Sequence, residues 1–126
     1  MKHLTKVLFV LVALSLSTTL SAQSGSEAYA EAHKISAEAD KELNAAYDQL
    51  IKSIRADNEK DRTELLVARL KESQRAWLKY RDAQVAFVGI HANIGSASSR
   101  AIGMASYSAD LTKERIKDLT TVPNPF

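Results

Sequence analysis

The chain has 126 residues, a formal net charge of +2 and no cysteine. This length allows a single domain. The absence of cysteine excludes a disulfide scaffold and a thiol nucleophile.

Residues 1–22 have the pattern of a signal peptide. Lys2 and Lys6 give a basic start, an apolar run spans residues 7–16, and Ala22 offers a cleavage position. The apolar run is short for a membrane span, although an uncleaved anchor is the alternative interpretation. Without these residues the chain has 15 basic and 15 acidic side chains. This balance argues against nucleic acid as a partner, and we expect no membrane contact after cleavage.

Residues 23–26, "QSGS", predict a linker, and a first helix is expected over residues 27–56. That stretch contains neither Gly nor Pro and is rich in Ala, Glu, Lys and Leu. At 100° per residue one face gathers the apolar positions. The predicted face consists of Tyr29, Ala32, Ser36, Leu43, Tyr47, Leu50, Ile51 and Ile54.

A second helix is predicted from residue 61 or 62 to residue 92, after the polar break "DNEKD". Asp61 is the expected N-cap, with Glu64 three residues later completing a capping box. Trp77 and Tyr80 are predicted as core or near-core aromatics, whereas Lys71, Arg75, Lys79 and Asp82 point away from the core. The predicted inner stripe is Leu66, Leu70, Ser73, Trp77, Tyr80, Arg81, Gln84 and Val88.

Residues 92–99 read as a loop, and residues 99–119 as a third helix. Its expected apolar face holds Ile102, Ala105, Ala109, Thr112, Ile116 and Leu119. Residues 121–126 form a non-helical tail. Long helices with short connections predict an all-α fold, an antiparallel three-helix bundle with a domain over residues 27–120.

Arg81 lies close to the apolar stripe of the second helix, and a buried guanidinium needs a partner. If the first hairpin turns near residue 59, Asp40 faces the turn that carries Arg81. We therefore predict an Asp40–Arg81 ion pair, with Asn44 and Gln74 hydrogen-bonding beside it. The i, i+4 spacing of Trp77 and Arg81 also allows a cation–π contact.

The chain offers little for catalysis. His33 and His91 are isolated, so neither a metal site nor a cofactor is expected. The serines have no His-and-acid arrangement nearby, and no Gly-rich phosphate loop follows a strand. We therefore predict that the protein is not an enzyme.

Three segments, "ADKELNAAYDQL", "LKESQRAWLKYRDAQ" and "LTKERIKDL", resemble the signature blocks of the LprI-like lysozyme-inhibitor domain. The resemblance covers nearly the whole chain after residue 22. The matching positions are Asp40, Leu43, Asn44, Tyr47, Gln74, Arg75, Trp77, Tyr80, Arg81, Asp82, Leu111, Thr112 and Arg115. Members commonly carry two cysteines where this chain has Val85 and Tyr107, so an apolar contact is expected in place of a crosslink.

The resemblance implies an exported bacterial envelope protein, periplasmic or secreted, that binds a lysozyme or another peptidoglycan hydrolase and blocks it. A lysozyme cleft is lined by two working carboxylates, which a cation or a hydroxyl-rich loop would suit. The loop 93–100, with Ser96 and Arg100, is one candidate surface. The row Lys71, Arg75 and Lys79 is the other.

Each candidate surface has a plainer interpretation: a helix connector for the loop, a solvated face for the row. Residues 27–64 carry ten acidic and six basic side chains, and residues 65–126 nine basic and five acidic. This asymmetry fits either attraction between helices or a functional basic face. The alternative functions are a non-inhibitory module that binds another envelope protein or a toxin, and a helical protein that touches lipid through its basic half.

Overall fold

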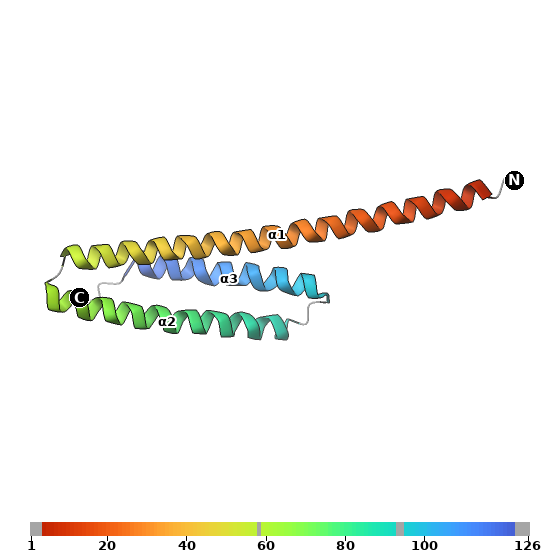
Figure 1. Ribbon diagram of the computed structural model, residues 1–126. Helices are drawn as coiled ribbons and strands as arrows, with labels where there is room; N and C mark the ends of the chain where they lie inside the picture. Colours follow the sequence, from red (N-terminus) through yellow and green to blue (C-terminus); the bar gives the residue numbers. More distant parts are fainter. Residues whose placement is uncertain (1–3, 58, 93–94, 123–126) are drawn as a thin grey trace.

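The computed structural model describes residues 4–57, 59–92 and 95–122, with side chains from residue 24 onward except Asp57. Three helices follow in chain order, α1 (Leu4–Asp57), α2 (Lys60–His91) and α3 (Ala97–Thr120). In Figure 1 α1 runs from right to left, α2 returns from left to right and α3 runs from right to left again, so α2 is antiparallel to both other helices. The described residues contain no strand. The predicted all-α three-helix bundle is confirmed.

The first two helices begin earlier than predicted. Residues 23–26, predicted as a linker, lie within α1. The predicted Asp61 cap is wrong, because α2 begins at Lys60 and its N-cap is Glu59, which makes no side-chain capping bond. The chain enters the helix directly after Glu59, whose carbonyl accepts from Thr63 N at 2.8 Å. Asp61 therefore lies in the first turn, where its charge still favours the positive end of the helix dipole.

The connection between α2 and α3 is shorter than predicted. α2 ends at His91, and α3 begins at Ala97, two residues before the expected start. Ser96 is the N-cap of α3, with its Oγ accepting from Ser99 N at 3.0 Å. This side-chain cap satisfies one of the free N–H groups at the helix start, and it explains why the helix begins before Ser99.

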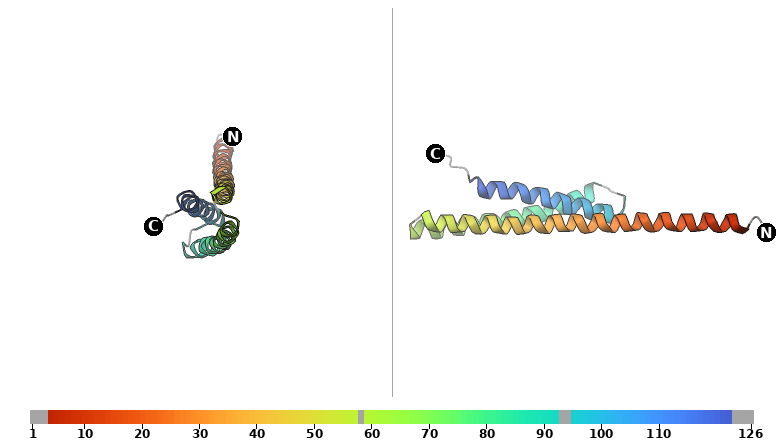
Figure 2. Two further views of the ribbon diagram at one scale, coloured as in Figure 1. Left: turned by 90° about the vertical axis from the view of Figure 1, so that its left-hand side faces the viewer. Right: turned by 90° about the horizontal axis from the view of Figure 1, so that it is seen from above.

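Small buried residues bring α1 and α3 close together. On α1 the alanines at 32, 39 and 46 are buried, and α3 buries Ala105, Ala109 and Thr112. The spacing of seven keeps the three α1 alanines on one line of the helix. Small side chains reduce the distance between helix axes, and α1 indeed approaches α3 far more closely than it approaches α2. Figure 2 shows α3 lying against both neighbours.

The main apolar cluster lies where all three helices meet. Leu43, Ala46 and Leu119 are buried there. Partly buried residues from the three helices pack around them: Tyr47, Leu50, Leu70, Trp77 and Ile116.

Trp77 belongs to this cluster as predicted, but Tyr80 is 54% exposed, so its predicted place in the core is wrong. Gln74 is buried on the core side of α2. Tyr80 follows Gln74 by six residues, so its side chain leaves the helix roughly 120° away from that of Gln74. This rotation turns Tyr80 out of the core.

Candidate functional site

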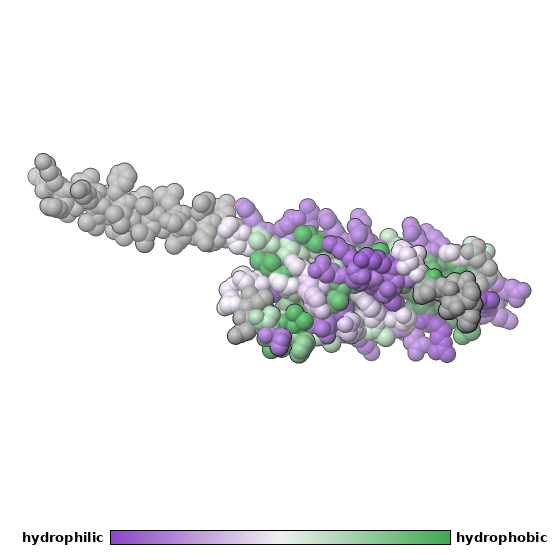
Figure 3. All heavy atoms as spheres, turned by 180° about the vertical axis from the view of Figure 1, so that it is seen from behind, coloured by the Kyte–Doolittle hydropathy of each residue, from purple (hydrophilic) through white to green (hydrophobic). Residues whose placement is uncertain are grey.

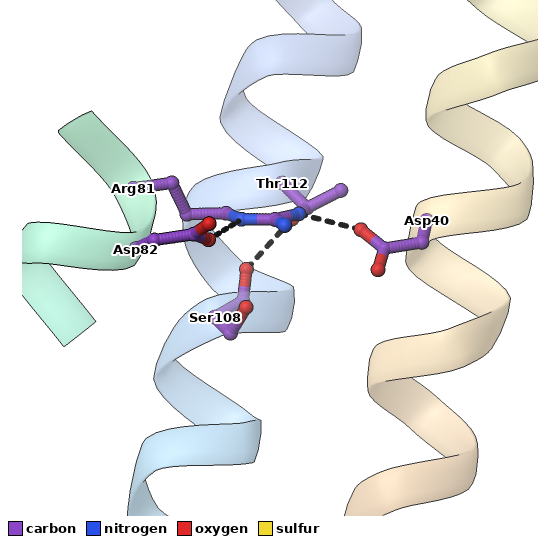
Figure 4. A network of polar contacts seen from close by, with 5 residues as sticks. All are labelled: Asp40, Arg81, Asp82, Ser108 and Thr112. Atoms are coloured by element: carbon purple, nitrogen blue, oxygen red, sulfur yellow. Dashed lines mark hydrogen bonds and ion pairs between the residues drawn. The ribbon is translucent and has the colours of Figure 1, made fainter. Parts of the chain in front are cut away.

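Arg81 joins all three helices through one guanidinium (Figure 4). Its Nη1 donates to Asp40 Oδ1 of α1 at 2.5 Å and to Thr112 Oγ1 of α3 at 3.1 Å. Its Nε donates to Asp82 Oδ1, the next residue on α2, at 3.2 Å. The Arg81 side chain is only 12% exposed, whereas Asp40 is 48% exposed. The predicted Asp40–Arg81 pair is confirmed.

Thr112 places a hydroxyl in the middle of the bundle. It is 1% exposed and is the largest side chain buried to that extent in the described part of the chain. Its Oγ1 accepts from Arg81 and donates to the backbone carbonyl of Ser108 at 2.8 Å. Both functions of the hydroxyl are therefore used, which removes the penalty of burying an unpaired polar group.

Arg115 of α3 makes a second bridge, to α2. Its Nε donates to Gln74 Oε1 at 3.1 Å, and its Nη2 donates to Ser73 Oγ at 2.8 Å. The predicted hydrogen bonding of Gln74 with Asn44 is wrong. The charged guanidinium is the stronger donor, while Asn44 stays exposed on α1.

Two guanidinium groups lie over the ring of Trp77. The Cζ atom of Arg81 lies 5.3 Å from the ring centroid, and the Cζ atom of Arg115 lies 5.9 Å from it. The contact with Arg81 follows from the i, i+4 spacing. The contact with Arg115 depends on the register of α3, which the sequence pattern had not fixed. Among the described side chains, no buried nitrogen or oxygen lacks a hydrogen-bond partner, so these motif residues form a complete internal network.

An open groove of about 470 Å³ runs between α1 and α2. It exists because these two helices approach each other less closely than either approaches α3. Its lining residues come only from these two helices: Asp40, Leu43, Asn44, Tyr47, Lys71, Gln74, Arg75, Leu78 and Arg81. The first and second signature blocks therefore meet in one groove.

The predicted cation row borders this groove. Lys71, Arg75 and Lys79 are exposed, as expected, and no carboxylate pairs with any of them in the described part of the chain. A second hollow of about 460 Å³ lies on the other side of the row. Lys71 and Arg75 line both hollows. We call Lys71, Arg75 and Lys79 the cation ridge.

Charges on α3 are arranged differently. Lys117 Nζ contacts Glu114 Oε1 at 2.6 Å, and Arg115 Nη1 lies 3.8 Å from Asp118 Oδ2. The face of the molecule seen from behind in Figure 3 is mostly hydrophilic, with scattered apolar residues, so charged side chains on it are in contact with solvent. Arg115 and Lys117 therefore have acidic partners on their own helix, which the cation ridge lacks.

The second predicted surface, with Ser96 and Arg100, lies elsewhere. Both residues are exposed near the start of α3. Arg75 lies roughly 24 Å along α2 from His91, where that helix ends. The structure therefore does not combine the two candidate surfaces into one site.

His33 and His91 each pack against an aromatic ring. The ring centroids of His33 and Tyr29 are 4.3 Å apart, and those of His91 and Phe87 are 5.5 Å apart. In the part of the chain that the structure describes, no three His, Cys, Asp or Glu side chains gather closely enough to hold a metal ion. None of the described helices has the length and apolar character needed to cross a membrane.

The family model described as "Lysozyme inhibitor LprI" matches residues 18–119. The chain belongs to the LprI lysozyme inhibitor family. The match starts within the predicted signal peptide and ends one residue before the predicted end of the domain. No curated protein and no solved structure matches the chain.

Val85 and Tyr107, where the resemblance led us to expect an apolar contact in place of a crosslink, lie near one another along the bundle. Gln84, next to Val85, donates from Nε2 to the Tyr107 hydroxyl at 3.5 Å. Val85 itself lines a hollow with Met104 and Ser108, which flank position 107 on α3. This LprI chain therefore joins α2 and α3 here by non-covalent contacts.

Proposed function

We propose that this LprI protein is exported to the bacterial periplasm or secreted, where it binds a lysozyme or another peptidoglycan hydrolase and blocks it. The observation that carries the proposal is the family match over residues 18–119. LprI is a family of inhibitors, so the protein is proposed to act by binding and to need no cofactor. Residues 1–22 supply the proposed export signal.

The architecture supports a role in protein binding. Arg81, Arg115 and Thr112 tie the three helices together from the inside. A surface built on such a bundle is ordered before it meets a partner, so little conformational entropy is lost on binding. The outward-facing groove and cation ridge lie on this scaffold.

An activity titration tests the proposal. The protein, expressed from its full-length sequence, is added to c-, g- and i-type lysozymes that are digesting bacterial cell walls. We expect a saturable, stoichiometric loss of activity for at least one type, and no loss with a neutral helical protein of similar size as control. If all three enzymes keep full activity, the inhibitor proposal is contradicted. Pull-downs from periplasm would then test the alternative, a module that binds another envelope protein or a toxin.

A further inference from the structure

We propose that the cation ridge of α2, rather than the loop before α3, enters the substrate cleft of the inhibited hydrolase, with Arg75 at its centre. This inference rests on the proposed function and identifies the surface that performs it. The partner is recognised by its chemistry, an open cleft that carries two carboxylates.

The first argument is charge. Lys71, Arg75 and Lys79 follow one another at i, i+4 spacing, where like charges destabilise a helix by roughly 0.2–0.5 kcal/mol for each pair. In the described part of the chain none of the three cations forms an ion pair with a carboxylate, whereas Arg69, two residues before Lys71, pairs with Glu72. The positive charge of the ridge is therefore available to an acidic partner. Charge complementarity of this kind speeds association and favours one binding mode over others.

The second argument is spacing. Side chains four positions apart on a helix are separated by roughly 6 Å along the axis. The two working carboxyl groups of a glycoside hydrolase lie roughly 5–5.5 Å apart in retaining enzymes and 6.5–9.5 Å apart in inverting ones. Neighbouring cations of the ridge therefore match the separation of the carboxylates that they would meet.

The third argument is shape. Hollows of about 470 and 460 Å³ flank the ridge. A protein that fills a cleft must present a ridge, and the walls of the cleft need space beside it. The α1–α2 groove offers the half-buried Tyr47 as an apolar contact and Asn44 as an exposed hydrogen-bonding group for one such wall.

The loop before α3 is a weaker candidate because the hydroxyls of Ser96 and Ser99 already have partners. Ser96 Oγ accepts from Ser99 N, and the two side-chain hydroxyls lie 2.8 Å apart. Arg100, in the first turn of α3, is the cation of this predicted surface, and a single cation cannot match two carboxylates.

The test compares a triple variant, Lys71→Gln, Arg75→Gln and Lys79→Gln, with Arg100→Gln as the matched control. Glutamine keeps a polar, helix-compatible side chain and removes the charge, so we expect the helical circular dichroism signal and the melting temperature to stay near those of the parent. Interface arginines often dominate binding, so we expect the inhibition constant to rise about 100-fold in the triple variant and about tenfold in Arg75→Gln alone. The control should inhibit like the parent, and added salt should weaken the parent more than the triple variant.

Two results would contradict the proposed role of the cation ridge and leave the proposed function intact. They are full inhibition by the triple variant, and loss of inhibition in Arg100→Gln alone. Absence of inhibition by the parent would overturn both proposals. Vesicles of equal parts phosphatidylglycerol and phosphatidylethanolamine distinguish a lipid partner. If the triple variant loses vesicle binding but still inhibits, the ridge binds anionic lipid and the inference is wrong.

Discussion

Helix α1 has two very different neighbours. Toward α3 it presents alanines at 32, 39 and 46, and the two helices lie close together. Toward α2 it presents Leu43, Asn44 and Tyr47, and a groove stays open between the helices. The comparison shows how one amphipathic helix supplies a tight structural contact on one side and an accessible surface on the other.

The difference arises from side-chain volume and polarity. Alanine removes the side-chain layer that normally separates helices, so backbones approach and few gaps remain. On the α2 side, Trp77 and the guanidinium of Arg81 occupy the space between helices and hold them apart. Directional hydrogen bonds from Arg81 to Asp40 and Thr112 then fix the separation.

The largest effect on stability is expected from placing a larger side chain in the contact between α1 and α3. Ala109 is 1% exposed, and Ala109→Leu forces a longer side chain between closely packed helices. We expect a loss of about 3 kcal/mol in the free energy of unfolding, near the upper end for overpacked cores. Chemical denaturation measures it, with Ala45→Leu on the exposed face of α1 as the control. Equal stability of the two variants would contradict the close packing.

The next largest effect is expected on the α2 side, from Arg81→Ala. The change leaves Asp40 without its cation and removes the guanidinium from Trp77. Removing one member of a buried pair costs about 3–5 kcal/mol, and because Asp40 is half exposed we expect about 2 kcal/mol here.

A double-mutant cycle with Asp40→Ala isolates the pairwise contribution. The two positions should couple by about 1 kcal/mol in urea denaturation. Additive losses from the two single variants would show that the ion pair does not hold the helices.

A smaller effect is expected away from both contacts, at the cap of α3. Ser96→Ala removes the acceptor for Ser99 N and should cost about 1 kcal/mol. Ser96→Asp keeps an acceptor and should restore most of the stability. Thermal melting measures both variants. Under the ridge proposal neither changes inhibition, and a loss of inhibition that tracks Ser96 would favour the loop instead.

The smallest effect on stability is expected from neutralising the cation ridge. Replacing Lys71, Arg75 and Lys79 by glutamine removes repulsion at i, i+4 and breaks no ion pair in the described part of the chain. We expect the free energy of unfolding to stay within about 0.5 kcal/mol of the parent value. A loss of several kcal/mol would mean that these side chains belong to the structural network.

The sequence predicted the elements that depend on periodicity and hairpin register. Helix positions followed from composition, and the Asp40–Arg81 pair followed from placing the first turn near residue 59. The i, i+4 rule predicted the contact between Trp77 and Arg81. Each of these depends on local geometry or on a single turn, which few alternatives can satisfy.

The buried face of the third helix was predicted, but the side-chain bridges from Arg115 were not. The bonds from Arg115 to Gln74 and Ser73 need the register of α3 against α2, which a loop of several residues leaves free. The burial of the alanines at 39 and 46 was not predicted, because small residues add little to an apolar periodicity. The groove was missed for a related reason, since it follows from unequal spacing between helices rather than from any residue pattern.

The central claim is that the cation ridge contacts the hydrolase. Lysine acetylation, quantified by mass spectrometry with and without a saturating inhibited lysozyme, tests it directly. The account predicts that Lys71 and Lys79 lose reactivity in the complex, whereas Lys113 and Lys117 on the exposed face of α3 react as before. Unchanged reactivity at Lys71 and Lys79, together with protection on α3, would contradict it.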